Sequence, residues 1–315
     1  MELSVVVSTL NDRERLVSCL DALAERTPAE TERIVVNGPS SDGTTGVVRD
    51  RDDIDVLVEI SERTPNVSRN AGLELATGEV VAFLDGEYAI DHSWYEAIDE
   101  SMARGTDVVT GPVTGHPTDD RQSSHRVAGR TVTHLHGSNV AFDRSVLEAL
   151  DGFDEYLTAA GERDCAHRVA GLDFEVSWNA AMAARCEIGT DNGESDEMKG
   201  SSPELRSDGG CTGPDWGAAY RSLSYRLAKN YGLRPSVLAR TAGSALREGA
   251  AGVSRLAAGE ATPTGWFADG TDVIKNVTRG LWDGVRARYS DRSNRRNPNG
   301  LSQRHDRAVQ VYDWR

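Results

Sequence analysis

Short apolar runs alternate with segments of helical spacing along the first part of the chain. Residues 3–9, LSVVVST, are rich in β-branched side chains and predict a buried parallel strand. Similar runs predict further strands at 33–36, 56–60 and 80–84. The intervening segments have helical character, with Leu16, Leu20 and Leu23 on one face of the first and shorter helices at 44–50 and 67–76. This alternation predicts an α/β fold with a mostly parallel central sheet flanked by helices, which binds ligands at the carboxyl ends of its strands.

The hydrophobic pattern is weaker beyond Trp94. It indicates a helix at 93–103, a strand at 107–110, a polar loop at 115–124, an extended segment at 132–142 and a helix at 144–150. Residues 190–214 are rich in Gly, Ser, Asp and Glu and lack periodicity, so we expect a long mobile loop or linker there.

An amphipathic helix is predicted near the end of the chain. Over residues 272–289 the apolar positions form one stripe, with most basic side chains outside it. Such a helix either lies in a membrane interface or docks on the preceding domain, and the pattern fits both. Trp266, Phe267 and Trp282, together with the positive charge of this region, favour contact with anionic lipid.

The formal net charge of -15 is unevenly distributed over the 315 residues. From Arg234 onward 14 Arg and Lys residues stand against 8 Asp and Glu residues, whereas the preceding part is strongly acidic. Charge and pattern together predict an α/β domain at 1–189, an acidic loop or linker at 190–214 and a helical, basic C-terminal extension at 215–315.

The composition excludes several classes of protein. An acidic chain with three lysines lacks the basic footprint of a nucleic-acid-binding protein and resembles salt-adapted cytosolic proteins. Its four cysteines form no CxxC pair, which argues against a structural zinc site and a disulfide framework. No run approaches the roughly 18–20 apolar residues of a spanning helix, and no secretory signal is recognisable. We therefore expect a cytoplasmic protein.

Two acidic residues follow the apolar strand at 80–84. Asp85 and Glu87 are two positions apart at the strand's end, so both carboxylates can point toward one hard cation. Mg²⁺ or Mn²⁺ prefers such oxygen ligands together with substrate phosphates. Taken alone, Asp85-Gly86-Glu87 is equally compatible with an ordinary acidic turn.

Motifs along the chain occur in the order and at the spacing of glycosyltransferase family 2. The first group is VVVSTLND at 5–12, VVNGPSSDGT at 35–44, SRNAG at 68–72 and ATGEVVAFLDGE at 76–87. A second group resembles a later region of the family and comprises GSNVAF at 137–142, LDGFDE at 150–155 and GERDCAHR at 161–168. The chain is similar to this family over residues 3–180.

The resemblance implies the GT-A fold and an inverting hexosyl transfer from a nucleotide-diphosphate sugar, with UDP as the expected nucleotide. It implies a nucleotide-sugar site lined by Ser8, Thr9, Asn11, Asn37, Asp42, Arg69 and Asp85. Asp85 and Glu87 match the family's DXD motif, which implies bound Mg²⁺ or Mn²⁺. Leu10 stands where the family pattern has an aromatic residue, so aliphatic contact is expected to replace stacking on the base.

The family's catalytic base, a carboxylate that deprotonates the acceptor hydroxyl, has two candidates here. Counting back from Arg168 places Glu162 on the catalytic position. Aligning the motif at Gly161 instead leaves Asp164 as the nearest carboxylate. We favour Glu162 and keep Asp164 as the alternative.

The resemblance and the salt-adapted composition together are similar to haloarchaeal enzymes of lipid-linked N-glycan assembly. They imply a dolichol-phosphate-linked glycan as acceptor, a uronic acid as one candidate sugar, and a peripheral place on the cytoplasmic face of the membrane. A catalytically degenerate GT-A subunit that only binds or scaffolds is one alternative. A nucleotidyltransferase is another, but it needs a Gly-rich, basic loop after the first strand, where this chain has Ser-Thr-Leu-Asn.

Overall fold

The structure is a computed structural model of the 315-residue chain, and it describes residues 1–114, 124–186, 216–235, 239 and 263–315. Two segments of the sequence analysis, the linker predicted at 190–214 and nearly all of the polar loop at 115–124, lie outside these residues.

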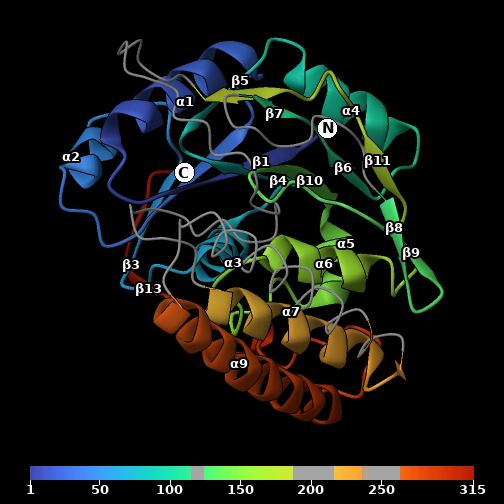
Figure 1. Ribbon diagram of the computed structural model, residues 1–315. Coiled ribbons are helices and arrows are strands. Elements are labelled where there is room, and N and C mark those ends of the chain that lie inside the picture. The colour runs from blue at the N-terminus through green and yellow to red at the C-terminus, as the bar shows by residue number, and fades with distance from the viewer. Residues whose placement is uncertain (115–123, 187–215, 236–238, 240–262) are drawn as a thin grey trace. The chain divides into compact units, whose positions relative to one another are not determined.

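An eight-stranded sheet forms the centre of the fold (Figure 1). Its strands are β1 (Leu3–Thr9), β2 (Glu32–Asn37), β3 (Val56–Ile60), β4 (Val80–Asp85), β6 (Val108–Thr110), β10 (Asn139–Asp143), β11 (Val176–Trp178) and β13 (Ala308–Asp313). Their order is β11-β6-β10-β4-β1-β2-β3-β13, with β10 and β13 antiparallel to their neighbours and the other pairs parallel. The mostly parallel α/β sheet predicted from the sequence is confirmed.

Helices cover both faces of this sheet, which explains why its inner strands β1, β2 and β4 are almost wholly buried. They are α1 (Arg13–Arg26), α2 (Thr44–Arg49), α3 (Pro65–Leu75), α4 (Trp94–Ala103), α5 (Arg144–Leu150) and α6 (Gly161–Val169). Figure 1 shows α1 and α4 above the sheet and α3, α5 and α6 below it. Helix α3 approaches the sheet closely at Gly72, where an added Cβ would lie 2.3 Å from a methyl of Val6.

The segment predicted to be extended over 132–142 is divided in the structure. Strand β9 (Arg130–Thr133) pairs with β8 (Ser124–Val127) in a separate two-stranded sheet, and the central sheet resumes only with β10. The intervening residues form a turn, which places Gly137 and Ser138 at the edge of the sheet where β4 ends. A three-stranded sheet of β5 (Tyr88–Ile90), β12 (Ala184–Cys186) and β7 (Val113–Thr114) follows β4.

The C-terminal end of the chain differs from the extension predicted at 215–315. The described chain divides into two compact units, and residues 299–315 belong to the unit that contains the central sheet. Strand β13 pairs with the edge strand β3 there, after the short 3₁₀ helix η2 (Leu301–Gln303). Sequence pattern alone did not indicate this return, because the pairing joins residues that are about 250 positions apart.

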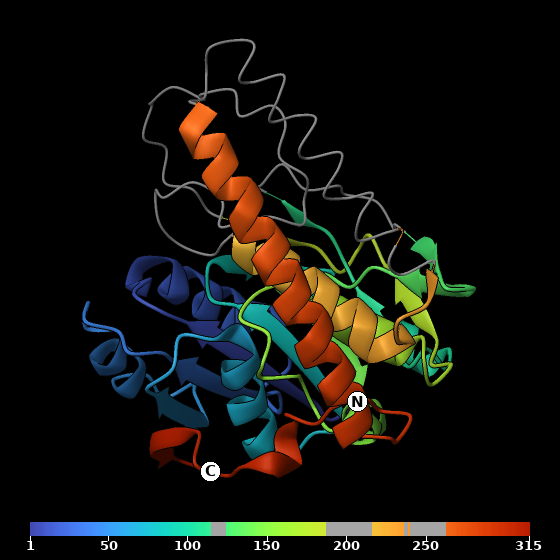
Figure 2. The same ribbon diagram turned by 60° about the horizontal axis from the view of Figure 1, so that its bottom comes forward.

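The second unit, called the helical unit here, comprises residues 125–132 and 196–298. Its long helices are α7 (Trp216–Tyr231) and α9 (Pro263–Ser290), which lie against each other in Figure 2. The amphipathic helix predicted at 272–289 falls within α9. The part of the chain that the structure describes contains no helix with the length and apolarity needed to cross a bilayer.

Candidate functional site

The candidate site lies at the edge of the sheet where β1, β2 and β4 end. Strand register pairs Ser8 with Asp85 and Thr9 with Asn37, so four of the predicted residues lie on adjacent strands. The hydroxyl of Thr9 is buried and has no hydrogen-bond partner among the residues that the structure describes. The backbone amide of Gly86 donates to the carbonyl of Ser8 at 2.8 Å, which fixes the start of the acidic motif against β1.

Asp85 is held from two sides. The hydroxyl of Ser138 donates to its Oδ2 at 2.5 Å, and Nη2 of Arg69 lies 3.8 Å from its Oδ1. The side chain of Asp85 remains 29% exposed, whereas that of Arg69 is 6% exposed. Asp85 therefore has a fixed orientation and an accessible carboxylate.

Glu87 is the second carboxylate of the motif. Its Oε2 pairs with Nη1 of Arg15 at 3.0 Å, and its side chain is 30% exposed. No group of three or more His, Cys, Asp or Glu that could hold a metal ion occurs among the described residues. Two accessible carboxylates nevertheless suit a hard cation that completes its shell with phosphate oxygens and water, as Mg²⁺ usually does. Asp85 and Glu87 each expose oxygen atoms of the kind that such a cation prefers.

A glycine in the turn before β10 lets Glu162, the predicted base, approach Arg69. A Cβ added at Gly137 would lie 3.0 Å from Cβ of Glu162 and 3.1 Å from Nη2 of Arg69. Glycine at this position therefore lets Glu162 and Arg69 approach each other beside Ser138, the hydrogen-bond partner of Asp85. Arg69 therefore lies close to Glu162, across Gly137, and to Asp85 of the acidic motif.

The two candidate bases lie in different environments on α6. Glu162 is 24% exposed, and its Oε1 lies 3.7 Å from Nε of Arg163. Asp164 is fully buried and accepts a 2.8 Å hydrogen bond from Nε of Arg168, which is itself fully buried. Burial alone would lower the pKa of Arg168, but the charges of Asp164, Cys165 and Asp154 and the hydrogen bond to Asp164 together raise it. The structure thus leaves only Glu162 of the pair accessible to a substrate.

The start of α6 is fixed by α3. Nδ2 of Asn66 donates to the carbonyl of Asp154 at 2.8 Å, and its Oδ1 accepts from Nη1 of Arg69 at 3.3 Å. A Cβ at Gly161 would lie 2.2 Å from Nδ2 of Asn66, so only glycine fits there. The buried side chain of Asn66 therefore helps to position both Arg69 and the helix that carries Glu162.

The loops after β1 and β2 hold each other in place. Asn11 has a positive φ of 51°, its backbone amide donates to the hydroxyl of Ser40 at 2.8 Å, and its Oδ1 accepts from the amide of Ser41 at 2.7 Å. Ser40 in turn donates to Oδ1 of Asn37 at 2.7 Å. Asn11 and Asn37 thus form the frame of the expected nucleotide pocket, with Leu10 against Gly38.

Asp42 lies just before α2, whose N-cap residue is Gly43. It accepts hydrogen bonds from the amide of Arg13 at 2.9 Å and from the amide and hydroxyl of Thr44 at 3.1 and 2.6 Å. Burial alone would raise the pKa of Asp42, but these hydrogen bonds outweigh it and lower the pKa. Asp42 is ionised at neutral pH and orders the loop beside Asn11.

Several residues of the site were not predicted from the sequence. Gly137 and Ser138 lie in the GSNVAF motif at 137–142, but the sequence predicted no role for them. Asn66, Arg15 and Ser68, whose hydroxyl donates to that of Ser8 at 2.8 Å, were also missed. Their roles come from contacts between distant segments, and the motifs themselves were the only available signal.

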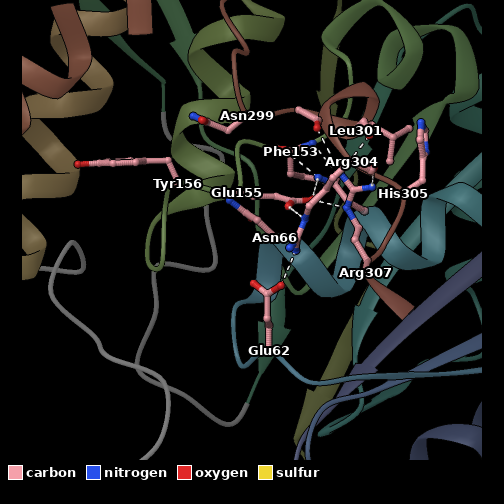
Figure 3. Close-up of polar contacts among 12 residues, drawn as sticks. Glu62, Asn66, Phe153, Glu155, Tyr156, Asn299, Leu301, Arg304, His305 and Arg307 are labelled. Carbon is pink, nitrogen blue, oxygen red and sulfur yellow. Dashed lines mark hydrogen bonds and ion pairs between the residues drawn. The ribbon is translucent and has the colours of Figure 1, made fainter. Parts of the chain in front are cut away.

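A segment near the C-terminus, residues 299–307, packs on α3 and on the loop that precedes α6, and is called the C-terminal strap here. Figure 3 shows Arg304 and Arg307 of the strap directed toward Glu155. Arg307 is fully buried, and pairs with Glu155 at 2.5 Å and with Glu74 of α3 at 2.6 Å. Arg304 pairs with the other oxygen of Glu155 at 2.8 Å. The strap therefore ties the chain's end to the support of the site.

Glu155 also links the strap to α3 directly. Nδ2 of Asn70 donates to Glu155 at 2.7 Å and to the carbonyl of Phe153 at 2.9 Å. The ring of Phe153 lies beneath the guanidinium of Arg69, with the centroid 5.6 Å from Cζ. These contacts connect the strap to Arg69 through the loop that contains Phe153 and Glu155.

Comparison with known proteins agrees with this arrangement. Residues 4–151 match the family model described as glycosyl transferase family 2. Glycosyltransferase AglE of Haloferax volcanii is 30% identical over 194 residues, which cover 56% of this chain and 63% of that protein. The glucosyl-dolichyl phosphate glucuronosyltransferase of the same organism is 26% identical over 185 residues, covering 52% of this chain and 59% of that protein. The chain thus matches less than two thirds of the length of either relative.

A solved structure shares the fold. The mannosyltransferase PcManGT from Pyrobaculum calidifontis, in complex with GDP-Man and Mn²⁺, is 21% identical with a TM-score of 0.55. The alignment covers 90% of this chain and 87% of that one. At this identity the likeness establishes the GT-A fold, as predicted. The family match agrees with the resemblance seen in the motifs: residues 4–151, which carry the loops after β1 and β2, Arg69 and the acidic motif, match the model of glycosyltransferase family 2.

Proposed function

We propose that the protein is an inverting glycosyltransferase that moves a hexosyl group from a nucleotide-diphosphate sugar to a lipid-linked glycan in protein N-glycosylation. The observation that carries this proposal is the convergence of Glu162, Arg69 and Asp85 around Gly137. A base, a cation for the departing phosphates and a metal-binding carboxylate are the groups that such a transfer requires.

The donor would bind across the carboxyl ends of β1 and β2. Ser8, Thr9 and Asn11 line the first loop, and the unpartnered hydroxyl of Thr9 is available to a ligand. Asn37 and Asp42 shape the second loop, in which the base and ribose would lie. UDP is the nucleotide we expect.

A divalent cation, Mg²⁺ or Mn²⁺, would be held by Asp85 and Glu87, and when bound it supplies positive charge to the leaving diphosphate. PcManGT was solved with Mn²⁺, which supports this assignment. Arg69 acts at the same place, since its guanidinium is 6% exposed and close to Asp85. A cation held in such a dry position stabilises developing phosphate charge without reorganisation.

Glu162 would act as the general base. Its carboxylate accepts the proton of the acceptor hydroxyl while that oxygen forms a bond to the anomeric carbon. The bond between the anomeric carbon and the diphosphate oxygen breaks on the opposite side, so the configuration inverts. The nucleoside diphosphate carries away the electron pair.

A dolichol-phosphate-linked glycan is the proposed acceptor, and a uronic acid is one candidate sugar. The support is the similarity to a dolichyl phosphate glucuronosyltransferase and to AglE. Such an acceptor resides in the membrane, so we also propose peripheral contact with its cytoplasmic face through residues 272–289.

Turnover of a panel of nucleotide sugars with dolichyl-phosphate-linked acceptors tests the proposal. We expect transfer that stops when a chelator removes divalent cations and returns with Mg²⁺ or Mn²⁺. Asp85→Asn should lower the rate by roughly 10²–10³-fold, the range for loss of one stabilising group. Glu148→Gln, an exposed change on α5, is the matched control. Full activity of Asp85→Asn would rule out the proposed donor site, and nucleotide binding without turnover of any donor would favour a degenerate binding subunit.

A further inference from the structure

Helix α9 packs on α7 with its small residues. A Cβ added at Gly280 would lie 2.1 Å from Oγ of Ser224, and one at Gly284 would lie 2.4 Å from the carbonyl of Tyr225. Ala287 is buried on the same side. Glycines at these positions let the two helices approach closely, and Val277, Leu281 and Val285 of α9 are half-buried beside them.

Three large apolar side chains among those described for α9 lie on the side away from the glycines and are exposed to solvent. Ile274, Trp282 and Tyr289 are 69%, 71% and 66% exposed. Burying a large apolar side chain is ordinarily worth about 1.5–3 kcal/mol, so three such residues left exposed on one helix indicate a surface that another apolar medium covers. Packing on α7 through Gly280, Gly284 and Ala287 does not use these three side chains.

The same side of α9 is basic. At 100° per residue, Lys275, Arg279 and Arg286 fall among the three apolar side chains, within an arc of about 140°. All three are exposed. We call these six residues the basic-aromatic face of α9; they are Ile274, Lys275, Arg279, Trp282, Arg286 and Tyr289. Arg292, just beyond the helix, adds a cation 6.0 Å from the ring centroid of Tyr289.

The acidic side chain described on this helix is already paired. Among the described side chains of α9 the one carboxylate is Asp283, which pairs with Arg221 of α7 at 3.0 Å. The basic-aromatic face is therefore a cationic surface on a chain whose net charge is -15. Charges beyond about 8 Å are screened at physiological ionic strength, so a partner at this face responds to its local cations.

Because this face combines exposed apolar side chains with positive charge, we infer that the basic-aromatic face of α9 binds the surface of an anionic lipid bilayer. Trp and Tyr suit the boundary between headgroups and acyl chains, and Lys and Arg between them contact lipid phosphates. The inference rests on the proposed function, since a lipid-linked acceptor requires the enzyme to work at a membrane, and it names the face and the lipid charge involved.

Vesicle flotation of the full chain without sugar donor or acceptor tests the inference. Vesicles of phosphatidylcholine are compared with vesicles that also contain phosphatidylglycerol, at the lowest salt at which circular dichroism shows a folded chain. Each basic side chain near an anionic surface strengthens binding about five-fold, so we expect Arg279→Gln with Arg286→Gln to weaken it roughly 25-fold. Added salt should reproduce much of this loss.

Trp282→Ser and Ile274→Ser separate the apolar part of the contact. We expect Trp282→Ser to weaken vesicle binding at least about ten-fold, also at high salt, because burial of apolar surface is not screened. Val309→Ser, at 68% exposure on β13, is the matched control for Ile274→Ser, and Trp314→Ser is the control for Trp282→Ser. Unchanged thermal unfolding shows that each variant folds.

Equal binding to both kinds of vesicle, or equal losses in the control variants, would overturn the inference. So would light scattering that shows a dimer broken by Trp282→Ser, because a second copy would then cover the face. These outcomes are independent of the proposed function: transfer to a short, water-soluble acceptor can persist without vesicle binding, and vesicle binding can persist without turnover.

Discussion

Carboxylates in two regions around the sheet have opposite surroundings. At the site, Asp85, Glu87 and Glu162 keep 29%, 30% and 24% of their side chains exposed. In the support behind it, Asp164 and Glu155 are 0% and 10% exposed and are paired at close range with buried arginines. We refer to these groups as the site carboxylates and the buried carboxylates.

The difference separates chemistry from support. An ionised carboxylate in the interior needs a cation and hydrogen bonds to offset its desolvation, and once enclosed it is out of reach of a substrate hydroxyl. A carboxylate with a quarter of its surface exposed can bind a cation or accept a proton. Glu162 and Asp164 lie two residues apart on α6, yet they belong to different groups.

The largest effect is expected from breaking the support. Arg307→Met removes the cation shared by Glu155 and Glu74, which leaves two partly buried charges without it. Loss of one partner of a buried pair costs about 3–5 kcal/mol, so denaturant titration should show a fall of this order in the free energy of unfolding. Arg304, which is 32% exposed, provides the control, since Arg304→Met should cost much less. Equal losses of unfolding free energy in the two variants would show that burial of the arginine does not determine how much the ion pair contributes to stability.

A smaller effect is expected from a change at the site itself. Gly137→Ala would press a methyl group against Glu162 and Arg69, at 3.0 and 3.1 Å, and move them by a few tenths of an ångström. A displacement of 1 Å can cost about 10²-fold in rate, so we expect kcat to fall roughly three- to ten-fold with little change in unfolding. Gly46→Ala, where nothing lies within 4 Å of the added Cβ, should leave kcat unchanged. A normal rate in Gly137→Ala would mean that these two side chains need not be close.

The smallest effect concerns Glu32, a carboxylate of intermediate character at the start of β2. Burial alone would raise its pKa, but hydrogen bonds from Ser4, Thr77 and Arg315 outweigh it and lower the pKa. The stabilisation that ionised Glu32 gives to the folded protein is therefore fully present above the unfolded-state pKa of about 4.3. It is lost as the pH falls through the lower pKa of the folded state.

Glu32→Gln should accordingly lower stability at neutral pH by about 0.5–1 kcal/mol, with the difference from the parent vanishing in acid. Unfolding titrations over a pH series measure it, with exposed Glu14→Gln as the control. A difference that persists unchanged in acid would contradict the assigned cause.

Much of the site's framework was predictable from local pattern. The strands at 3–9, 56–60 and 80–84 and the acidic motif behind the last of them follow from buried apolar runs. Strand β10, which enters antiparallel between β4 and β6, and β13 were not predictable, because short strands acquire their partners from segments far along the chain.

The separation of Glu162 from Asp164 also lay beyond the sequence. Both are acidic residues in the first turn of α6, and their spacing fits either role. What distinguishes them is that Arg168 is enclosed by the carbonyls of Leu150 and Gly152, at 2.8 and 3.0 Å, and turns Asp164 inward. That enclosure is a tertiary property, so motif alignment left the choice of base open.

The most direct test of the account measures Glu162→Gln and Asp164→Asn side by side for kcat/KM and for the free energy of unfolding. We predict that Glu162→Gln loses about 10²–10⁴-fold in kcat/KM, with a free energy of unfolding within about 0.5 kcal/mol of the parent. We predict the opposite pattern for Asp164→Asn: its free energy of unfolding should fall by about 3–5 kcal/mol, while the protein that remains folded keeps the greater part of its activity. Near-normal activity in Glu162→Gln, or loss of activity without loss of stability in Asp164→Asn, would contradict the assignment of Glu162 as the base.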